Sequence, residues 1–212
     1  MNKNEKFVIT INREVGSGGR TVGRKLAEKL GVKYFDKVVI ESLTKKFGVS
    51  AEEIERIKAQ KKTFWNELNT YYNNIVASAS KPMDDEVRIT TYSMFDTEKK
   101  ILQEIATKES CAVAGRSGFM VFRKWPNHLN ILIHASLENR IARIMKRQEV
   151  SEVKAREIIA KVDADRETFI KKYENTSRYD ARNYQLVISM DELDEDSAVD
   201  VICNYIDHMS KK

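Results

Sequence analysis

The fold of this chain is most constrained by an apolar segment that runs directly into a glycine-rich turn. Residues 7–11 (FVITI) have the composition of a buried strand, and residues 16–19 (GSGG) precede a helix expected over 20–30. Glycine allows positive φ and a close approach of the backbone to a ligand, and the first N–H groups of a helix attract anions. The order strand, glycine-rich turn, helix therefore predicts a loop that binds phosphate groups.

Two positions of this loop differ from the usual phosphate-binding motif. The pattern G-x-x-x-x-G-K-[ST] expects glycine where Arg13 stands and lysine where Gly19 stands. Arg20, in the first helical turn, and Arg13, just before the loop, are the two candidates to supply the missing positive charge. For Arg13, a salt bridge to Glu14 or to a neighbouring loop is the structural alternative.

Length and composition indicate one globular domain over residues 1–212. The chain is 42% hydrophobic and 33% charged, and no apolar run approaches the length of a membrane-spanning helix. The lack of such a run predicts no membrane association. Cys111 and Cys203 are isolated, which indicates a reducing, cytoplasmic location. The net charge of +5 permits nucleic acid as a partner, but the arginines gather around the phosphate loop, which favours small polyanions instead.

The remaining pattern predicts an α/β protein with a five-stranded parallel sheet. Apolar segments separated by helical stretches are typical of strands that are covered on both faces, so a three-layer arrangement is expected. The four further strands are expected at 32–35, 111–115, 129–135 and 185–190.

Residues 36–110 are almost wholly helical in pattern and predict a helical insertion after strand two. Helices are expected at 37–47, from Ser50 onward, at 63–79 and at 97–108, with a turn at 80–86. The helix at 63–79 has a large aromatic face, for which core packing is favoured and a homodimer contact is the alternative.

After strand four, residues 136–175 predict two arginine-bearing helices that form a lid. The first helix is capped by Ser136. One arc of this helix carries the apolar residues Leu137, Ile141 and Ile144, and another arc carries Arg140, Arg143 and Arg147. In the second, from Ser151 to about 173, Arg166 lies within the apolar arc, where Asp163 is placed to orient it. Arginine binds phosphate through paired, charge-assisted hydrogen bonds, although a solvated basic face explains the first stripe equally well.

Four stretches of the chain, in this order, resemble the cytidylate kinase-like family: ITINREVGSGGRTVGRKLAEKLGVKYFDK, CAVAGRSG, the arginine-rich region and NYQLVIS. Members of this family are P-loop relatives of nucleoside-monophosphate kinases. The resemblance implies a phosphate loop after strand one, an acceptor-binding helical region after strand two and a lid after strand four. It implies transfer of the γ-phosphoryl group of ATP to CMP, dCMP or a similar small acceptor, with Mg²⁺.

The resemblance also implies site residues. Gly16, Ser17, Gly18, Gly19, Arg20 and Thr21 would surround the donor phosphates, with Thr21 beside the metal. Apart from the resemblance, Arg13 is placed to fold over the loop from the other side. Arg20, Arg140 and Arg166 would act on the transferring group. Asp36, Arg116, Arg143 and Arg147 would bind the acceptor.

Three departures from the family pattern leave other functions open. Gly19 replaces the loop lysine, Ser117 replaces an aspartate that reads cytosine, and the segment after Asp36 lacks the expected turn and arginine. The alternatives are a nucleotide-binding regulatory protein, for which Gly19→Lys would raise activity, and a P-loop kinase for another metabolite. For Asp36 the structural alternative is a helix N-cap, and His134 is expected to be structural.

Overall fold

The computed structural model describes residues 1–37, 39–40 and 92–210. Most of the predicted helix 37–47, the helix from Ser50, the aromatic helix 63–79 and the turn at 80–86 lie outside the described residues. The elements are β1 (Val8–Arg13), α1 (Gly19–Lys29), β2 (Lys33–Phe35), α5 (Tyr92–Lys108), β3 (Cys111–Ala114), α6 (Gly118–Val121), β4 (His128–His134), α7 (Leu137–Gln148), α8 (Glu152–Glu174), a 3₁₀ turn (Ala181–Asn183), β5 (Leu186–Ser189) and α9 (Glu195–Met209).

The five strands form one sheet in the order β2-β3-β1-β4-β5, and every neighbouring pair is parallel. The predicted parallel sheet is therefore confirmed. The connection after β1 leads to β2, on one side of β1, and the connection after β3 leads to β4, on the other. Such a topological switch point leaves a crevice beyond the carboxyl ends of the two strands, where ligands bind in open α/β sheets.

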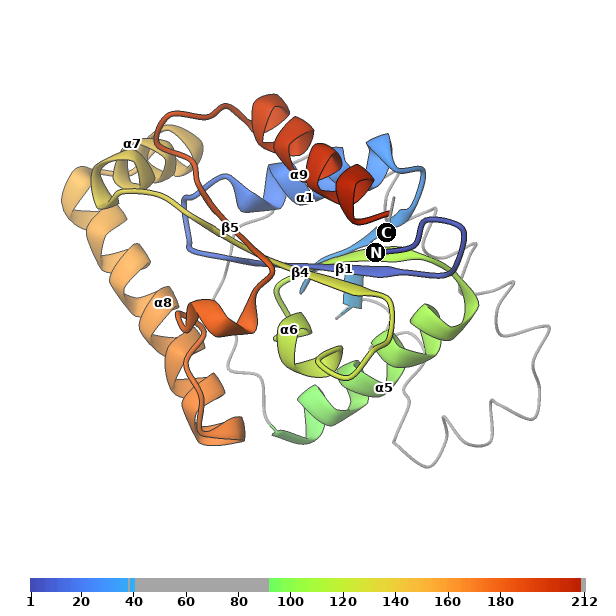
Figure 1. Cartoon of the computed structure of the whole chain (residues 1–212). Coiled ribbons are helices and arrows are strands. Elements are labelled where there is room, and N and C mark those ends of the chain that lie inside the picture. The colour runs from blue at the N-terminus through green and yellow to red at the C-terminus, as the bar shows by residue number, and fades with distance from the viewer. Residues whose placement is uncertain (38, 41–91, 211–212) are drawn as a thin grey trace.

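Helices cover both faces of the sheet, as the continuous apolar strands predicted. Ile9 and Ile11 of β1 pack with α1 and α9 on one face, whereas Val8 packs with α5 and with Phe35 on the other. Figure 1 shows α1 and α9 above the sheet and α5 and α6 below it. The alternation follows from the period of two along a strand.

The two arginine-bearing helices lie together at the side where β1 turns into α1 (Figure 1). They pack on the loop through Val15, which is 2% exposed and belongs to the same buried apolar cluster as Ile141, Ile144 and Ile159. Helices α7 and α8 are thus attached to the phosphate loop by a small apolar core.

The helix ends agree with the capping signals of the sequence. The Ser136 hydroxyl accepts a hydrogen bond from the Asn139 N–H at the start of α7, and Ser151 accepts one from Lys154 at the start of α8. Gly31 follows α1 with φ +66°, which is the conformation that favours glycine after a helix.

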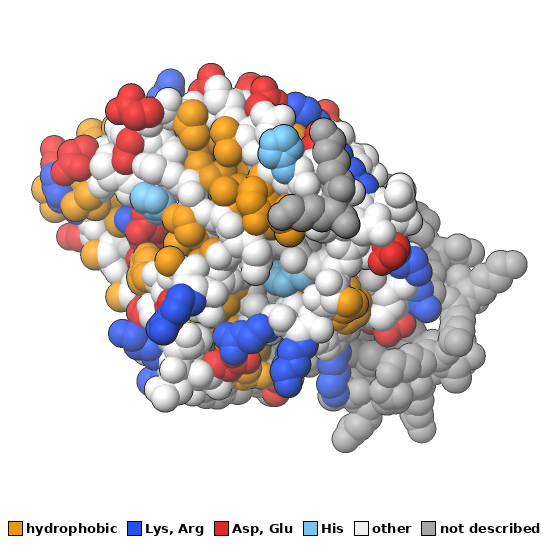
Figure 2. All heavy atoms as spheres, in the orientation of Figure 1, with side chains coloured by type: hydrophobic (Ala, Val, Ile, Leu, Met, Phe, Trp, Pro, Cys, Tyr) orange, Lys and Arg blue, Asp and Glu red, His pale blue; other side chains and the backbone are white. Residues whose placement is uncertain are grey.

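One face of the molecule carries an apolar patch over β5 and α9 (Figure 2). These two elements expose Val187, Val201 and Met209, each by about two fifths of its surface. No helix in the described part of the chain is long and apolar enough to span a membrane.

Candidate functional site

The loop between β1 and α1 has the backbone shape that phosphate binding requires. Gly16 and Gly18 adopt φ of +82° and +85°, and a Cβ at Gly16 would lie 2.7 Å from the carbonyl oxygen of Arg140. The Ser17 hydroxyl closes the turn by donating to the carbonyl of Glu14 at 3.0 Å. Among the described residues, no acceptor binds the backbone N–H of Gly16 or Gly18, so both N–H groups can donate to an anion.

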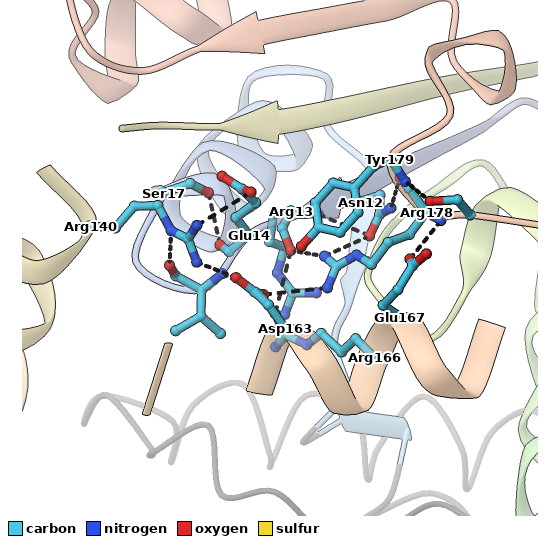
Figure 3. Close-up of polar contacts among 12 residues, drawn as sticks. Asn12, Arg13, Glu14, Ser17, Arg140, Asp163, Arg166, Glu167, Arg178 and Tyr179 are labelled. Carbon is cyan, nitrogen blue, oxygen red and sulfur yellow. Dashed lines mark hydrogen bonds and ion pairs between the residues drawn. The ribbon is translucent and has the colours of Figure 1, made fainter. Parts of the chain in front are cut away.

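A buried carboxylate, Asp163 of α8, joins the loop to the surrounding arginines (Figure 3). It accepts the N–H of Val15 at 3.3 Å and a hydrogen bond from Arg140, and it faces Arg178 at 3.4 Å. Arg166, one turn along α8, approaches it at 3.7 Å, as the spacing in the sequence predicted. Asp163 therefore fixes the loop backbone and orients three guanidinium groups at once.

The predicted division of α7 into an apolar arc and an arginine flank is wrong at two positions. Leu137 is 41% exposed, whereas Arg140 is only 7% exposed. The Arg140 side chain turns back to the loop, where Nε donates to the carbonyl of Val15 at 2.7 Å and Nη1 faces Glu14 at 3.3 Å. A helical wheel cannot reveal this, because the partners of Arg140 come from other segments of the chain.

The other predicted cationic residues lie around the loop in different surroundings. Arg143 contacts Gly18, since a Cβ there would be 2.6 Å from its Nη1, and it pairs with Glu195. Arg20 pairs with Asp36, and two of its nitrogens lie 2.8 and 2.9 Å from Oδ2. Arg147 is exposed further along α7. The roles of these residues toward a ligand stay predictions.

Asp36 serves the structural role that the sequence left open. Its Oδ1 accepts the N–H of Val39 at 3.2 Å, as an N-cap does, while Oδ2 binds Arg20. At 4% exposure, this carboxylate fixes the direction of Arg20.

Arg178 is a buried member of the site that the sequence reasoning missed. It is 1% exposed and donates to the carbonyl of Arg13, which also accepts from Arg166 at 3.4 Å. Its own carbonyl accepts the hydroxyl of Tyr184 at 2.6 Å, and burial raises the pKa of Tyr184 to about 12. The segment 175–185 has no helical or strand periodicity, so nothing in the pattern distinguished Arg178.

The chain after β3 makes an unusual left-handed turn. Gly115, Arg116 and Ser117 have φ of +76°, +51° and +50° in succession. Non-glycine residues in this region cost about 1 kcal/mol or more each and gather at functional sites. The Arg116 guanidinium pairs with Glu98 of α5, a carboxylate that is 1% exposed. Glu98 was also missed, although its position one helical turn before Leu102, in the apolar stripe predicted over 97–108, is a signal for a buried charge.

Arg13 is the last residue of β1, and its side chain lies between the phosphate loop and this turn. A Cβ at Gly19 would be 2.7 Å from the Cβ of Arg13, and a Cβ at Gly115 would overlap the Arg13 Nη1. The strand predicted over 7–11 begins one residue later, at Val8, and extends through Asn12 and Arg13, because both residues pair in register with β4. Arg13 is consequently 8% exposed, and no ion pair to Glu14 forms.

The loop residues fit a nucleotide phosphate chain. Arg140 and Arg143 of α7 lie against Gly16 and Gly18, which explains why glycine stands at both positions. The N–H groups of the two glycines, which no described acceptor binds, are donors for phosphate oxygens. The Thr21 hydroxyl makes no hydrogen bond to any described residue and is the residue here that would hold Mg²⁺.

Comparison with known proteins agrees with this architecture. The sequence model of a cytidylate kinase-like family matches residues 8–192. No curated protein sequence is significantly similar to the chain.

Among solved structures, an uncharacterized protein from Eubacterium ventriosum superposes with a TM-score of 0.69 at 22% identity, over 95% of this chain and 99% of that one. A shikimate kinase from Bacteroides thetaiotaomicron gives 0.51 at 13% identity, over 95% and 98% of the two chains. A shikimate kinase from Acinetobacter baumannii, in complex with shikimate, gives 0.50 at 14% identity, over 98% and 97%. At these identities, the likeness shows that the fold is that of P-loop kinases.

Proposed function

The chain belongs to the cytidylate kinase-like family, and from this premise we propose that it transfers the γ-phosphoryl group of ATP to CMP or dCMP. The observation that carries the proposal is the loop between β1 and α1, with left-handed Gly16 and Gly18 at the switch point of a P-loop kinase fold. A donor phosphate chain bound there would end beside β3, where an acceptor has access from the same crevice.

Some residues around the loop would bind the donor phosphates, and others hold the loop backbone in position. The N–H groups of the loop would bind donor phosphates, and Thr21 would hold Mg²⁺, which neutralises charge on the β- and γ-phosphates when it is bound. Arg140 and Asp163 keep the loop in shape, because both bind its backbone at Val15. Phosphoryl transfer depends mainly on such positioning and on electrostatics.

On the acceptor side, Asp36 and Arg116 lie at the ends of β2 and β3, and Arg143 and Arg147 lie on α7. We propose that Arg116 and the exposed Arg147 reach the acceptor phosphate, whereas Asp36 acts through Arg20. The pairing of Arg116 with Glu98 and of Arg143 with Glu195 would orient these guanidinium groups before the acceptor binds.

A second candidate is a nucleotide-binding regulatory protein without transfer. It is favoured by Gly19, which supplies no side-chain charge, and by the pairing of Arg20, Arg140 and Arg143 with carboxylates. Such a protein would bind ATP through the loop backbone and leave the γ-phosphate in place.

A coupled ADP-release assay with Mg-ATP separates the candidates. The acceptors are CMP, dCMP, UMP, AMP and shikimate, the last representing a non-nucleotide alcohol. Turnover with CMP or dCMP above the others is expected, and Thr21→Val should reduce it more than the matched change Thr107→Val on α5. If no acceptor is turned over at ATP concentrations that raise the melting temperature, the regulatory function replaces the kinase.

A further inference from the structure

Arg13 is a buried cation for which the described part of the chain provides no anion. The residue is 8% exposed, yet its guanidinium forms no hydrogen bond or ion pair with any described residue. Its neighbours differ in this respect, since Arg140 and Arg178 both face Asp163. Its nitrogens are not among the fully buried atoms that lack a hydrogen-bond partner in the described residues, so the guanidinium keeps a narrow access to water. Burying most of a cation with no anion beside it is unfavourable for folding, so the fold keeps Arg13 at a cost.

The surroundings of Arg13 leave room for this one side chain. Gly19 lies against its stem, where a Cβ would be 2.7 Å from the Cβ and 3.4 Å from the Cγ of Arg13. Gly115 lies against its guanidinium, at the start of the left-handed turn. Both glycines lack the atoms that would occupy the space of Arg13, so the site is built around it.

The main chain also fixes the direction of this side chain. The Arg13 N–H donates to Oδ1 of Asn12 at 3.1 Å, and the Arg13 carbonyl accepts from Arg178 and Arg166. The side chain thus starts beside Gly19, the first residue of the helix that follows the loop, and ends at the carboxyl end of β3. This is the switch point, between the loop and the residues expected to meet an acceptor.

We propose that Arg13 is the cation of this phosphate loop and that it binds the terminal phosphate of a nucleoside triphosphate in place of the lysine that Gly19 lacks. The proposal rests on the proposed function for the identity of the ligand. Arg20, the other candidate, is bound to Asp36 through two of its nitrogens. A guanidinium at this position differs from a lysine in offering two parallel hydrogen bonds to phosphate oxygens.

The test compares ATP and ADP binding by calorimetry in the wild type, in Arg13→Gln and in Arg24→Gln. Arg24 is an exposed arginine of α1, so its substitution removes the same charge one turn beyond Arg20. Arg13→Gln should weaken ATP binding by about 10- to 100-fold, the loss expected for hydrogen bonds to a charged group. ADP affinity should stay within about a factor of three, and Arg24→Gln should change neither affinity by more than that.

A second measurement distinguishes ligand binding from a structural role. Without ligand, Arg13→Gln and Arg13→Lys should melt no lower than the wild type, because no described partner is lost, and Arg13→Lys should retain part of the ATP affinity. Lower melting of both variants, or equal losses for ATP and ADP, would overturn the proposal, as would a wild type that does not bind ATP. If the wild type binds ATP through Arg13 but transfers no phosphate, only the kinase function fails.

Discussion

The contact between Arg13 and Gly19 predicts that lysine cannot be returned to the loop by one substitution. A Cβ at position 19 would lie 2.7 Å from the Cβ of Arg13 and 3.2 Å from the Cβ of Ile133. Both neighbouring atoms are stems fixed to strands, so neither can swing away as the end of a flexible side chain would. Gly19→Lys alone is therefore expected to disturb the loop, whereas Arg13→Gly with Gly19→Lys removes the larger of the two overlaps.

The magnitude follows from the cost of overpacking. Inserting atoms into a well-packed site typically costs about 1–3 kcal/mol, and the second positive charge beside Arg13 adds to this. Arg13→Gly alone costs about 0.5–1 kcal/mol through backbone entropy, offset in part by the loss of a mostly buried charge that no described residue pairs with. The free energy of unfolding of the double variant should therefore exceed, by about 1–3 kcal/mol, the value expected if the effects of the two single variants were additive.

Urea unfolding of the four proteins without ligand measures this coupling, and calorimetry with ATP measures its effect on binding. Gly19→Ala is the comparison that introduces the overlap without the charge. ATP affinity should fall in both single variants and recover in the double variant. Free energies of unfolding that add to within about 0.5 kcal/mol would refute the reasoning, since they would show that positions 13 and 19 are independent.

Three further predictions concern the groups around this pair. Asp163→Asn should destabilise the protein by about 3–5 kcal/mol in urea unfolding, because it removes the buried carboxylate that faces Arg140 and Arg178, whereas Asp165→Asn, exposed on the same helix, should have little effect. Glu195→Gln should tighten ATP binding by up to about fivefold in calorimetry, because it leaves Arg143 beside Gly18 without its carboxylate partner. Glu192→Gln, at an exposed position, is the control. Unchanged ATP affinity in both variants would contradict a role of the Arg143–Glu195 pair in ATP binding. Burial lowers the pKa of His128 from 6.5 to about 4, so the unfolded chain takes up a proton at higher pH than the folded chain does. The contribution of neutral His128 to the free energy of unfolding should be fully present above about pH 6.5 and fall by up to about 3 kcal/mol as the pH drops to 4. Urea unfolding across this pH range should show a smaller loss in His128→Gln. The control His208→Gln, at an exposed position, should not reduce the loss.

The fold could be predicted from the sequence because its signals are local. Apolar runs marked all five strands, and the caps at Ser136 and Ser151 marked the two helices after β4. The strand end at Arg13 could not be predicted in this way. Asn12 and Arg13 are polar and look like loop residues, and only their pairing with β4 extends the strand.

The site was less predictable, because the partners of its charged residues are distant in sequence. The position of Asp163 was expected to orient Arg166, but its contacts with Val15 and Arg140 join residues 148 and 23 positions apart. Glu98 could have been found, since an acidic residue in an apolar helical stripe indicates a buried partner. Arg178 could not, because it lies in an irregular segment.

Two energetically unfavourable features, one of a side chain and one of the backbone, lie next to each other beyond the carboxyl ends of β1 and β3. One is the mostly buried guanidinium of Arg13, which no anion of residues 1–37, 39–40 or 92–210 faces, and the other is the left-handed run from Gly115 to Ser117. A fold that only had to be stable would have an apolar side chain at position 13 and an ordinary turn after β3, and each change would lower the free energy of the folded state. The two features are connected through Gly115, whose missing Cβ makes room for the guanidinium. Unfavourable local features of this kind are expected at binding sites, where a bound ligand compensates for their energetic cost. Because both features lie at the switch point, an anion bound between Arg13 and the loop explains them better than a purely structural role does.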